Sequence, residues 1–462
     1  MLFSSLTFLF CFLPATVGMY YLVRRELRNI VLLLASILFY AWGEPRYLPV
    51  IFATITISFF GALAVERFKY KKILLTLFIL LDLSLLFYFK YTNFFLENLN
   101  MIFHQKWSLK VVLPLGISFY TFQALSYLVD VYRGQVKAQK NYLKIALYIC
   151  LFPQLIAGPI VKYHDVSDQI DNRQETIDKV YYGIRRFIIG LAKKVLIANT
   201  VGKIADQIFT LPVNEFDAPI AWLGAISYTL QIYYDFSGYS DMAIGLGSMF
   251  GFKFLENFNY PYISSSITEF WRRWHISLST WFKDYLYIPL GGNRKGKIRT
   301  YINLILVFLL TGFWHGASWI FVLWGLWNGL FILFERATGW AIKEATIFRK
   351  CLYHLYTIVV FVIGWVLFKS ENVVRARDYL LNMLGLTSGH EVYLKLPYYL
   401  NRFNLEILLI AILFAIPIFK DILNKKNVLV QTITNVILAI LFVMCVSELA
   451  VNTYNPFIYF RF

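Results

Sequence analysis

The stretch from residue 301 to residue 334 constrains the fold most strongly, because it contains no Asp, Glu, Lys or Arg. A straight α-helix of that length would be about 50 Å long at ~1.5 Å per residue, whereas the hydrocarbon core of a bilayer is ~30 Å thick. Gly312 and Gly316 lie near the middle of the stretch, where they allow the chain to turn tightly. The stretch therefore predicts two apolar helices, joined by a tight break, at membrane depth.

The composition of the whole chain is that of a membrane protein. Hydrophobic residues make up 59% of the 462 residues and charged residues only 15%, against ~45–50% and ~25% in soluble globular proteins. This composition excludes a soluble multidomain enzyme and a disordered chain. We expect an all-α, polytopic integral membrane protein with about ten to twelve transmembrane helices plus re-entrant helices. The other candidate spans are 1–23, 29–42, 47–65, 73–89, 111–131, 185–200, 219–236, 353–368, 404–419 and 427–449.

Basic residues between the apolar segments predict the orientation. The links 24–28, 66–72, 132–144 and 420–426 are rich in Lys and Arg, and the positive-inside rule places such links in the cytoplasm. We therefore expect a multi-pass protein of the plasma or inner membrane with both termini extracytoplasmic. The formal net charge of +17 agrees with this topology and with contact to anionic membrane lipid, so we expect no nucleic-acid partner.

Two local features narrow the possibilities further. Residues 145–158 are apolar, but they are too few to cross a bilayer and they end in Ala-Gly-Pro, which favours a re-entrant or broken helix. The four cysteines show no Cys-x-x-Cys motif and no mixed Cys/His spacing. We therefore expect neither a disulfide framework nor a metal site.

Residues 264–292 form a second unusual stretch. Ser266 and Glu269 have the spacing of a capping box, which marks the start of a helix. After it, residues Trp271, His275, Leu278 and Phe282 recur at helical spacing and would share one face. The intervening Arg272, Arg273, Lys283 and Asp284 are too polar for a simple span. This pattern predicts one amphipathic helix over 270–285, lying at the membrane interface.

Four ionisable residues are the main candidates for a functional site. His315 lies in the uncharged stretch, and an ionisable residue at membrane depth is a functional candidate by default. Its structural alternative is a neutral imidazole bonded to a backbone carbonyl. For His275 the alternative is a buried packing residue. For Asp235 and Asp241 it is an ion pair with a lysine, or a helix cap.

These residues support two classes of function. In an acyltransferase, a neutral imidazole takes the proton of a hydroxyl group that attacks a thioester or ester carbonyl. In a transporter or proton relay, intramembrane His and Asp carry protons. Transporters of that kind usually contain repeated halves with paired broken helices, and this sequence shows no such repeat. The single Trp-rich region 264–334 therefore favours an enzyme.

Two motifs in this region resemble those of the membrane-bound O-acyltransferase (MBOAT) family. They are Trp-Arg-Arg-Trp-His-Ile-Ser-Leu-Ser-Thr-Trp-Phe-Lys-Asp-Tyr-Leu-Tyr-Ile-Pro-Leu-Gly-Gly at 271–292 and Thr-Gly-Phe-Trp-His-Gly at 311–316. Within the family, the chain is similar to bacterial alginate O-acetyltransferase membrane subunits, also at 33–45, 235–243 and 454–460. The resemblance implies one membrane-embedded domain over 1–462, with a catalytic core at about 111–336 and helices surrounding a central tunnel.

The resemblance also implies a reaction. His315 matches the catalytic histidine of the family, and His275 matches the second motif position. The implied donor is acetyl-coenzyme A, used from the cytoplasm without a bound cofactor, and the acetyl group modifies an extracytoplasmic polysaccharide through a separate extracytoplasmic acetyltransferase or acceptor protein. The alternative within the family is D-alanyl transfer from an acyl carrier protein to teichoic acid. Further candidates for substrate binding are Trp271, Arg272, Arg273, Trp274, Asp235, Asp241 and Trp314.

Overall fold

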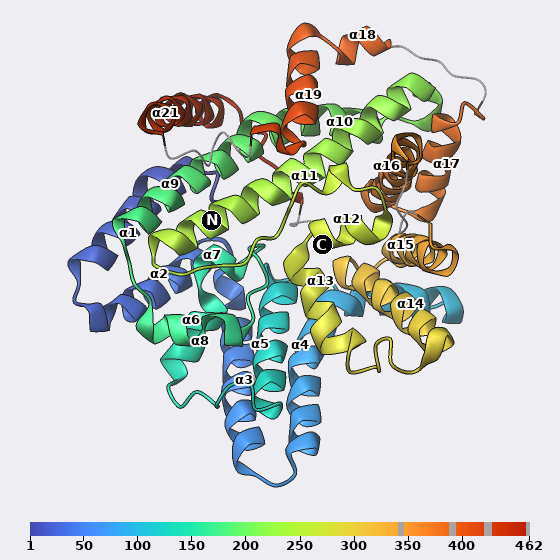
Figure 1. Ribbon diagram of the computed structural model, residues 1–462. Coiled ribbons are helices and arrows are strands. Elements are labelled where there is room, and N and C mark those ends of the chain that lie inside the picture. The colour runs from blue at the N-terminus through green and yellow to red at the C-terminus, as the bar shows by residue number, and fades with distance from the viewer. Residues whose placement is uncertain (341–345, 388–393, 420–426, 459–462) are drawn as a thin grey trace. The chain divides into compact units, whose positions relative to one another are not determined.

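The computed structural model describes residues 1–340, 346–387, 394–419 and 427–458, and within these ranges the secondary structure is entirely helical (Figure 1). Among the described residues, seven helices are long and apolar enough to cross a membrane. The other apolar segments form shorter or more polar helices. The all-α, multi-pass membrane class is thus confirmed. The seven spans are Arg25–Gly43, which contains α2 (Arg28–Gly43), Pro45–Arg67, which contains α3 (Leu48–Arg67), and the helices α4 (Lys71–Phe103), α14 (Gly296–His315), α15 (Trp319–Thr338), α16 (Ile347–Lys369) and α21 (Val428–Val451).

The chain divides into two compact units. Unit 1 comprises residues 1–187 and 239–255, and unit 2 comprises residues 188–238 and 256–462. Two of the three boundaries fall within α9 (Ile177–Ala192) and α11 (Ala218–Met249), and the third lies between Leu255 and Glu256.

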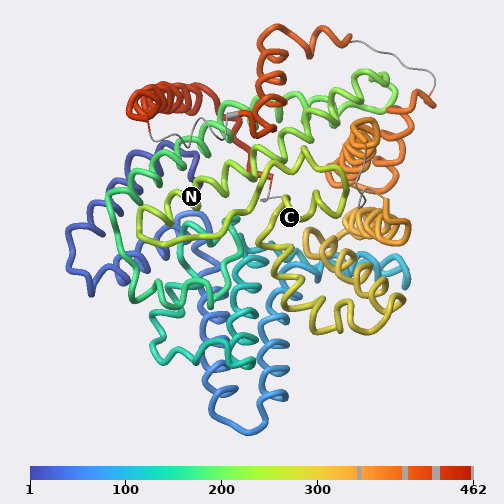
Figure 2. The backbone as a smooth tube through the Cα atoms, viewed as in Figure 1, coloured from blue at the N-terminus to red at the C-terminus, as the bar shows by residue number. Residues whose placement is uncertain are grey.

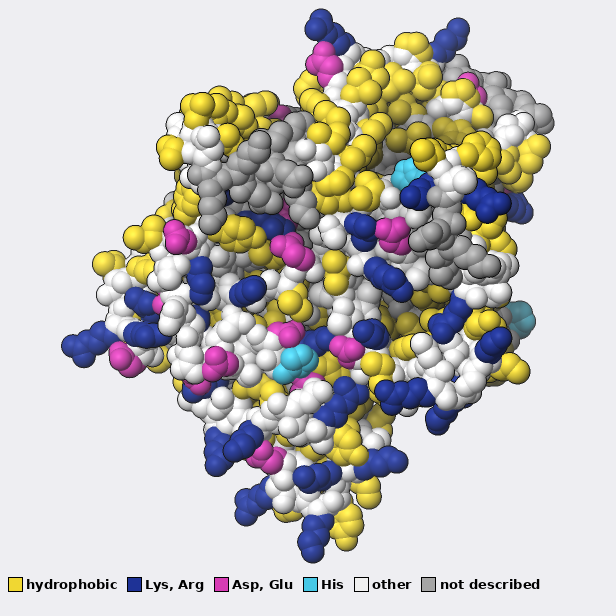
Figure 3. Space-filling model, in the orientation of Figure 1, with side chains coloured by type: hydrophobic (Ala, Val, Ile, Leu, Met, Phe, Trp, Pro, Cys, Tyr) yellow, Lys and Arg dark blue, Asp and Glu magenta, His cyan; other side chains and the backbone are white. Residues whose placement is uncertain are grey.

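Unit 1 contains a bundle in which α3, α4 and α5 pack side by side (Figures 1 and 2). At the tip of this bundle, Figure 3 shows a concentration of Lys and Arg side chains, which belong to the exposed α3–α4 link with Arg67, Lys69, Lys71 and Lys72. The remaining elements of unit 1 are a π-helical turn (Phe8–Phe12), α1 (Leu13–Leu22), α5 (Ile117–Tyr132), α6 (Tyr142–Cys150), α7 (Phe152–Leu155), α8 (Tyr163–Asn172) and parts of α9 and α11.

The segment 145–158 is a broken helix, as predicted. The helix α6 has nine residues and α7 has four, so neither is long enough to cross a bilayer. Leu151 between them has an extended ψ of 110°, and Pro153 follows in the first turn of α7. Because proline has no N–H to donate and a fixed φ, it suits the start of a new helix better than the interior of a longer one.

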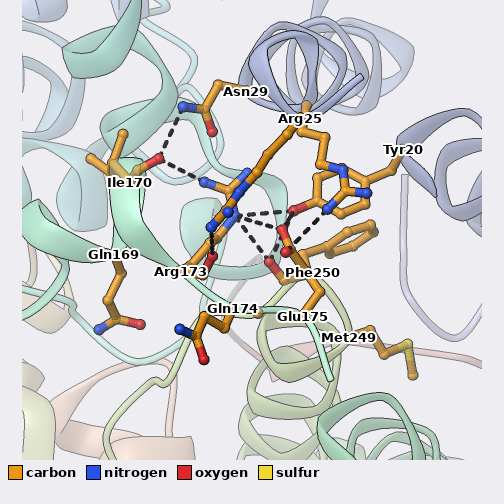
Figure 4. A network of polar contacts seen from close by, with 12 residues as sticks. Tyr20, Arg25, Asn29, Gln169, Ile170, Arg173, Gln174, Glu175, Met249 and Phe250 are labelled. Atoms are coloured by element: carbon orange, nitrogen blue, oxygen red, sulfur yellow. Dashed lines mark hydrogen bonds and ion pairs between the residues drawn. The ribbon is translucent and has the colours of Figure 1, made fainter. Parts of the chain in front are cut away.

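Polar residues of the 160–180 region are held in a buried network (Figure 4). The guanidinium of Arg173 donates from Nε to the Tyr20 hydroxyl at 3.0 Å and to the Phe250 carbonyl at 3.1 Å. Its Nη1 donates to the Ile170 carbonyl at 2.8 Å. Tyr20 also donates to Glu175. These contacts tie α1 and the end of α8 to the segments just before α9 and just after α11, and they satisfy polar groups that would otherwise be costly to bury.

His164 is a charged structural residue that sequence reasoning passed over. Its Nδ1 lies 2.8 Å from Asp130 of α5, and its Nε2 lies 3.2 Å from Asp165. Hydrogen bonds to these two carboxylates raise the pKa of His164 to about 9. Since both ring nitrogens face carboxylates, the imidazolium is a structural link between α5 and α8.

Replacing His164 with glutamine should therefore destabilise the protein in a pH-dependent manner. A histidine with a folded-state pKa raised above its unfolded value of ~6.5 gives its full stabilisation below that value and loses it as the pH rises through the folded pKa. We expect the variant to melt at a lower temperature than the parent at pH 6, with the difference shrinking as the pH rises through about 9. Thermal unfolding in detergent across this range measures it. An equal difference at pH 6 and pH 10 would contradict the assignment.

Unit 2 is built around aromatic side chains from α12, α15 and α16. Trp274 lies 4.7 Å from Trp365, and Trp324 lies 6.1 Å from Trp365, between ring centroids. The other elements of unit 2 are a π-helical turn (Lys193–Ala198), α10 (Asn199–Thr210), α12 (Ile267–Arg273), α13 (Ile276–Phe282), a second π-helical turn (Lys283–Tyr287), α17 (Val373–Met383), α18 (Leu396–Tyr399) and α19 (Arg402–Phe414).

The uncharged stretch forms the predicted helical hairpin. Helix α14 ends at His315 and α15 begins at Trp319, and the two helices run side by side (Figures 1 and 2). They approach so closely that a Cβ added at Gly312 would lie 2.2 Å from the Phe321 carbonyl oxygen, and one at Gly325 would lie 2.3 Å from that of Phe308. Such small residues at an interface are typical of packed membrane helices.

Two expectations about helix length need correction. The predicted single helix over 270–285 is wrong: α12 ends at Arg273 and α13 starts at Ile276. The Arg273 carbonyl accepts from Asn259 N–H, and Ile276 N–H donates to the Asn257 carbonyl, both at 2.9 Å, so the 257–259 segment takes over bonds that would continue a helix. The predicted span 219–236 is part of the longer α11, whose polar residues Ser227, Gln231 and Asp235 are buried.

The cytoplasmic placement of the link 420–426 lies outside the described residues.

Candidate active site

His315 ends α14 and faces an aromatic cluster. The side chain is almost fully buried, at 5% exposure. Its ring lies edge-on to Trp324 of α15 at 5.1 Å and to Phe368 of α16 at 5.2 Å between centroids. The close Gly312–Gly325 contact holds the two helices together near the break and so fixes this position. The hairpin thus places an imidazole in apolar surroundings at the end of a membrane-spanning helix.

His275 occupies the break between α12 and α13. It is 1% exposed, and its backbone is left-handed, with φ at +44°. This conformation is unfavourable for a residue with a Cβ and persists only where the surroundings impose it. Burial lowers the pKa of His275 to about 3, so the imidazole is neutral at physiological pH.

Asn257 determines which nitrogen of His275 carries the proton. The Asn257 Oδ1 atom accepts from Ser277 N–H at 3.2 Å and from the Ser277 hydroxyl at 2.9 Å, and it lies 3.1 Å from His275 Nδ1. A backbone N–H can only donate, so the atom facing it is the amide oxygen. His275 Nδ1 must therefore donate to the same oxygen. In this tautomer, Nε2 keeps its lone pair and can accept a hydrogen bond.

Trp314 connects the two histidines. Its ring centroid lies 4.9 Å from that of His315 and 6.4 Å from that of His275. Trp271 supports the other side of the cluster, because its ring contacts Trp324 at 5.7 Å and its Nε1 donates to Asn328 at 3.2 Å. The structure thus brings His275, His315, Trp271 and Trp314 into one site.

Other predicted site residues have structural partners. Arg273 binds Glu269 at 2.9 Å and donates to the Asn259 carbonyl at 3.1 Å, so it fixes the loop that carries Asn257. Trp274 packs in the aromatic core. Asp235 pairs with Lys194 at 2.7 Å and accepts from Ile458 N–H at 2.8 Å.

Asp241 pairs with Arg186 at 2.6 Å within unit 1, whereas both histidines belong to unit 2. The ion-pair alternative fits the geometry of both aspartates, although the partner of Asp241 is an arginine and not the expected lysine. Of the two arginines among the predicted substrate-binding residues, Arg272 differs from Arg273 in being exposed.

Arg272 lies at an apolar groove formed by α12, α13 and α14. The groove has a volume of about 240 Å³ and includes Trp271, Arg272 and Lys283. Arg272 and Lys283 are both exposed, and neither makes an ion pair with a described residue. Two cations beside an apolar channel suit a ligand with an anionic end and an uncharged arm. Its other lining residues include Leu278, Phe282, Leu304, Val307, Phe308 and Thr311.

Sequence reasoning missed Asn257, which lies in a loop 18 residues before His275. No local pattern marks it. Sequence reasoning also missed Lys194 as the partner of Asp235, and Glu335, a buried carboxylate of α15. A charged residue within an apolar segment could have indicated these contacts, because a buried charge is rarely tolerated without a bonded partner.

Replacing Asn257 with alanine should impair the site and, to a lesser degree, stability. The change leaves buried donors of His275 and Ser277 without their acceptor, which typically costs ~1–3 kcal/mol, and it releases the His275 tautomer. We expect turnover per folded molecule to fall about tenfold or more, with a lower melting temperature. Asn404→Ala on α19, which removes an asparagine side chain that donates to the Tyr399 carbonyl, is a matched control. Parental turnover in Asn257→Ala would contradict the role.

The comparisons with known proteins identify the family of the chain. The family model of the membrane-bound O-acyltransferase family matches residues 74–375. The chain is 43% identical to a probable alginate O-acetylase of Pseudomonas putida over 100% of both chains. It is 38% identical to a peptidoglycan O-acetyltransferase of Helicobacter pylori, over 91% of this chain and 87% of the relative. A teichoic acid D-alanyltransferase of Bacillus subtilis is 33% identical over 44% of this chain and 54% of its own length.

The matched region contains both histidines, the α14–α15 hairpin and the cationic groove. The chain therefore belongs to the membrane-bound O-acyltransferase family and is an O-acyltransferase.

Proposed function

We propose that this protein transfers acetyl groups from cytoplasmic acetyl-coenzyme A across the membrane for O-acetylation of an extracellular polysaccharide. The observation that carries the proposal is the placement of two buried histidines around Trp314, beside a groove with two unpaired cations among the described residues. The full-length similarity to a probable alginate O-acetylase supports the acetyl group and the polysaccharide.

The groove fits the donor. Coenzyme A has an anionic phosphate end and a long, uncharged pantetheine arm that ends in the thioester. Arg272 and Lys283 would bind the phosphates, and the arm would lie along the apolar wall of α13 and α14 toward Trp271. Trp271 contacts Trp324, on which His315 packs. The thioester would thus reach the cluster that contains His315.

The proposed step is a direct transfer to a hydroxyl group. His315 accepts the proton of the hydroxyl while its oxygen attacks the thioester carbonyl, forming the new C–O bond. The C–S bond then breaks, and the departing thiolate takes the proton from the imidazolium, which leaves an acetyl ester, coenzyme A and a neutral histidine. His275, neutral and with Nε2 unprotonated, would accept a hydrogen bond from the donor or the acceptor.

The orientation follows from the basic links. If the α3–α4 link is cytoplasmic, the α4–α5 link lies outside. In a cysteine-free background, a cysteine replacing Lys71 should react with a membrane-impermeant thiol reagent only after the cells are opened, and one replacing Lys106 should react in intact cells. Both positions are exposed; Lys71 is the first residue of α4, and Lys106 lies just beyond its last residue, Phe103. Labelling of the Lys71→Cys protein from outside intact cells would contradict this orientation, which also places both termini outside.

We further propose that a separate extracytoplasmic acetyltransferase or acceptor protein receives the acetyl group and passes it to the polysaccharide. Membranes that contain the protein but lack this partner would then release coenzyme A more slowly than membranes that contain both. The partner resides outside the cytoplasm because the acceptor does.

D-Alanyl transfer is the second candidate, and the partial similarity to a teichoic acid D-alanyltransferase favours it. The two are separated by presenting sealed, inside-out membrane vesicles with labelled acetyl-coenzyme A or with labelled D-alanyl carrier protein. We expect alkali-labile acetyl label to accumulate in the first case and none in the second. Incorporation from the D-alanyl carrier alone would overturn the proposal in favour of the alternative.

A further inference from the structure

Glu335 is a fully buried carboxylate near the end of the membrane-spanning helix α15. Burying a carboxylate is expensive unless donors surround it. Glu335 accepts hydrogen bonds from Ile267 N–H, from Thr268 N–H at 2.9 Å and from the Thr268 hydroxyl at 2.6 Å. The Tyr356 hydroxyl of α16 donates to it at 3.3 Å.

Two of these donors are the first N–H groups of α12. The leading N–H groups of a helix have no partner within the helix, and a carboxylate there also interacts favourably with the helix dipole. Ser266 caps the next one, since its hydroxyl accepts from Glu269 N–H at 2.9 Å. Side chains from two elements therefore hold the N-terminus of α12, and the charged one comes from α15.

The same face of α15 serves both histidines. Trp324, Asn328 and Glu335 are separated by four and seven residues, so they align along one side of the helix. Trp324 packs on His315, Asn328 accepts from Trp271 of α12, and Glu335 binds the start of α12. One helix face thus fixes α12 at two points and contacts the His315 ring at a third.

We propose that Glu335 is a positioning residue, whose carboxylate holds α12 against α15 and so sets His275 in its place relative to His315. His275 lies two residues beyond the end of α12, where small movements of that helix reach it directly. The kinetic part of this proposal rests on the proposed function, because acyl transfer reports the alignment of the two histidines.

A double-mutant cycle with His275 tests the proposal. In Glu335→Gln, the amide nitrogen faces hydrogen-bond donors, so the attachment of α12 to α15 weakens while the side-chain volume stays the same. We expect turnover per folded molecule to fall about tenfold or more, as misplacement of reacting groups does. In a His275→Ala background, the same change should lower turnover less than about twofold, because the residue it positions is already gone. Two results would overturn the proposal. One is a double variant whose loss of turnover equals the product of the two single losses, and the other is parental turnover in Glu335→Gln.

Hydrogen exchange provides a readout that does not depend on activity. Amides 267–275 should exchange faster in Glu335→Gln than in the parent, whereas Glu406→Gln, which alters an exposed pair with Arg402, should leave them unchanged. If Glu335→Gln does not fold, Thr268→Val removes one donor to the same carboxylate and takes its place in both experiments. If amides 267–275 exchange at the parental rate in Glu335→Gln, Glu335 does not hold α12 in place. If the parent transfers no acetyl group, the proposed function fails, but the exchange result still shows whether Glu335 holds α12 in place.

Discussion

Replacing His315 with alanine is expected to lower acyl transfer by ~10²–10⁴-fold, the usual contribution of a general base. The imidazole lies at the end of α14, edge-on to Trp324 and Phe368, where it can take the proton of the attacking hydroxyl. Glutamine should not restore the activity, because an amide can form hydrogen bonds but cannot accept that proton. The measurement is the initial rate of acetyl transfer with matched amounts of folded, membrane-inserted parent and variants.

The His315→Gln variant separates two explanations for the loss. If His315 only binds the substrate by a hydrogen bond, the glutamine variant should retain near-parental turnover, and the general-base assignment would be wrong. His354→Gln is a suitable control, since that histidine donates from Nδ1 to the backbone carbonyl of Ser264. It is proposed neither as a general base nor as a substrate ligand. Its turnover should remain close to that of the parent.

Alanine at Gly312 or Gly325 should disrupt the α14–α15 hairpin. The new Cβ would lie 2.2 Å from the Phe321 carbonyl oxygen in the first variant and 2.3 Å from the Phe308 carbonyl oxygen in the second. Backbone atoms cannot rotate away as a side chain can, so the helices must separate. Overpacking of this kind typically costs ~1–3 kcal/mol, and we expect the upper end of that range together with a large loss of activity. Thermal unfolding and turnover measure the two effects.

Gly364→Ala on α16 is the matched control for these variants. The nearest atom to its added Cβ is Trp327 Cδ1 at 3.5 Å, an ordinary contact, and alanine is favoured over glycine in a helix by ~1 kcal/mol. We expect this variant to be as stable as the parent or more stable. A Gly312→Ala protein with the same melting temperature as Gly364→Ala would show that the hairpin does not depend on close approach.

Local patterns predicted much of the structure. The uncharged stretch and its glycines predicted the α14–α15 hairpin, and the Ser266–Glu269 spacing predicted the start of α12, because both features are decided by neighbours in the sequence. The Arg273–Glu269 pair could also have been found, since i,i+4 charges of opposite sign often pair on a helix. It gives Arg273 a structural partner, whereas Arg272 is left at the groove.

Contacts between distant segments account for what was missed. Helical spacing suggested that α12 and α13 were one helix, but bonds to the 257–259 segment interrupt it. Neither this pairing nor the left-handed His275 leaves a signal in the sequence, because glycine is absent at the break. Likewise, the ion pair between Asp235 and Lys194 joins residues that lie 41 positions apart in the sequence.

The most direct test of transfer across the membrane by His315 is to measure acetyl transfer from one face of proteoliposomes to the other. The parent and His315→Gln are reconstituted together with the extracytoplasmic acceptor, and labelled acetyl-coenzyme A is supplied only to the cytoplasmic face. With the parent, we expect alkali-labile acetyl label on the acceptor at the opposite face. With His315→Gln, we expect ~10²–10⁴-fold less label. Equal labelling by the two proteins, or labelling only when the donor is on the same side as the acceptor, would contradict this expectation.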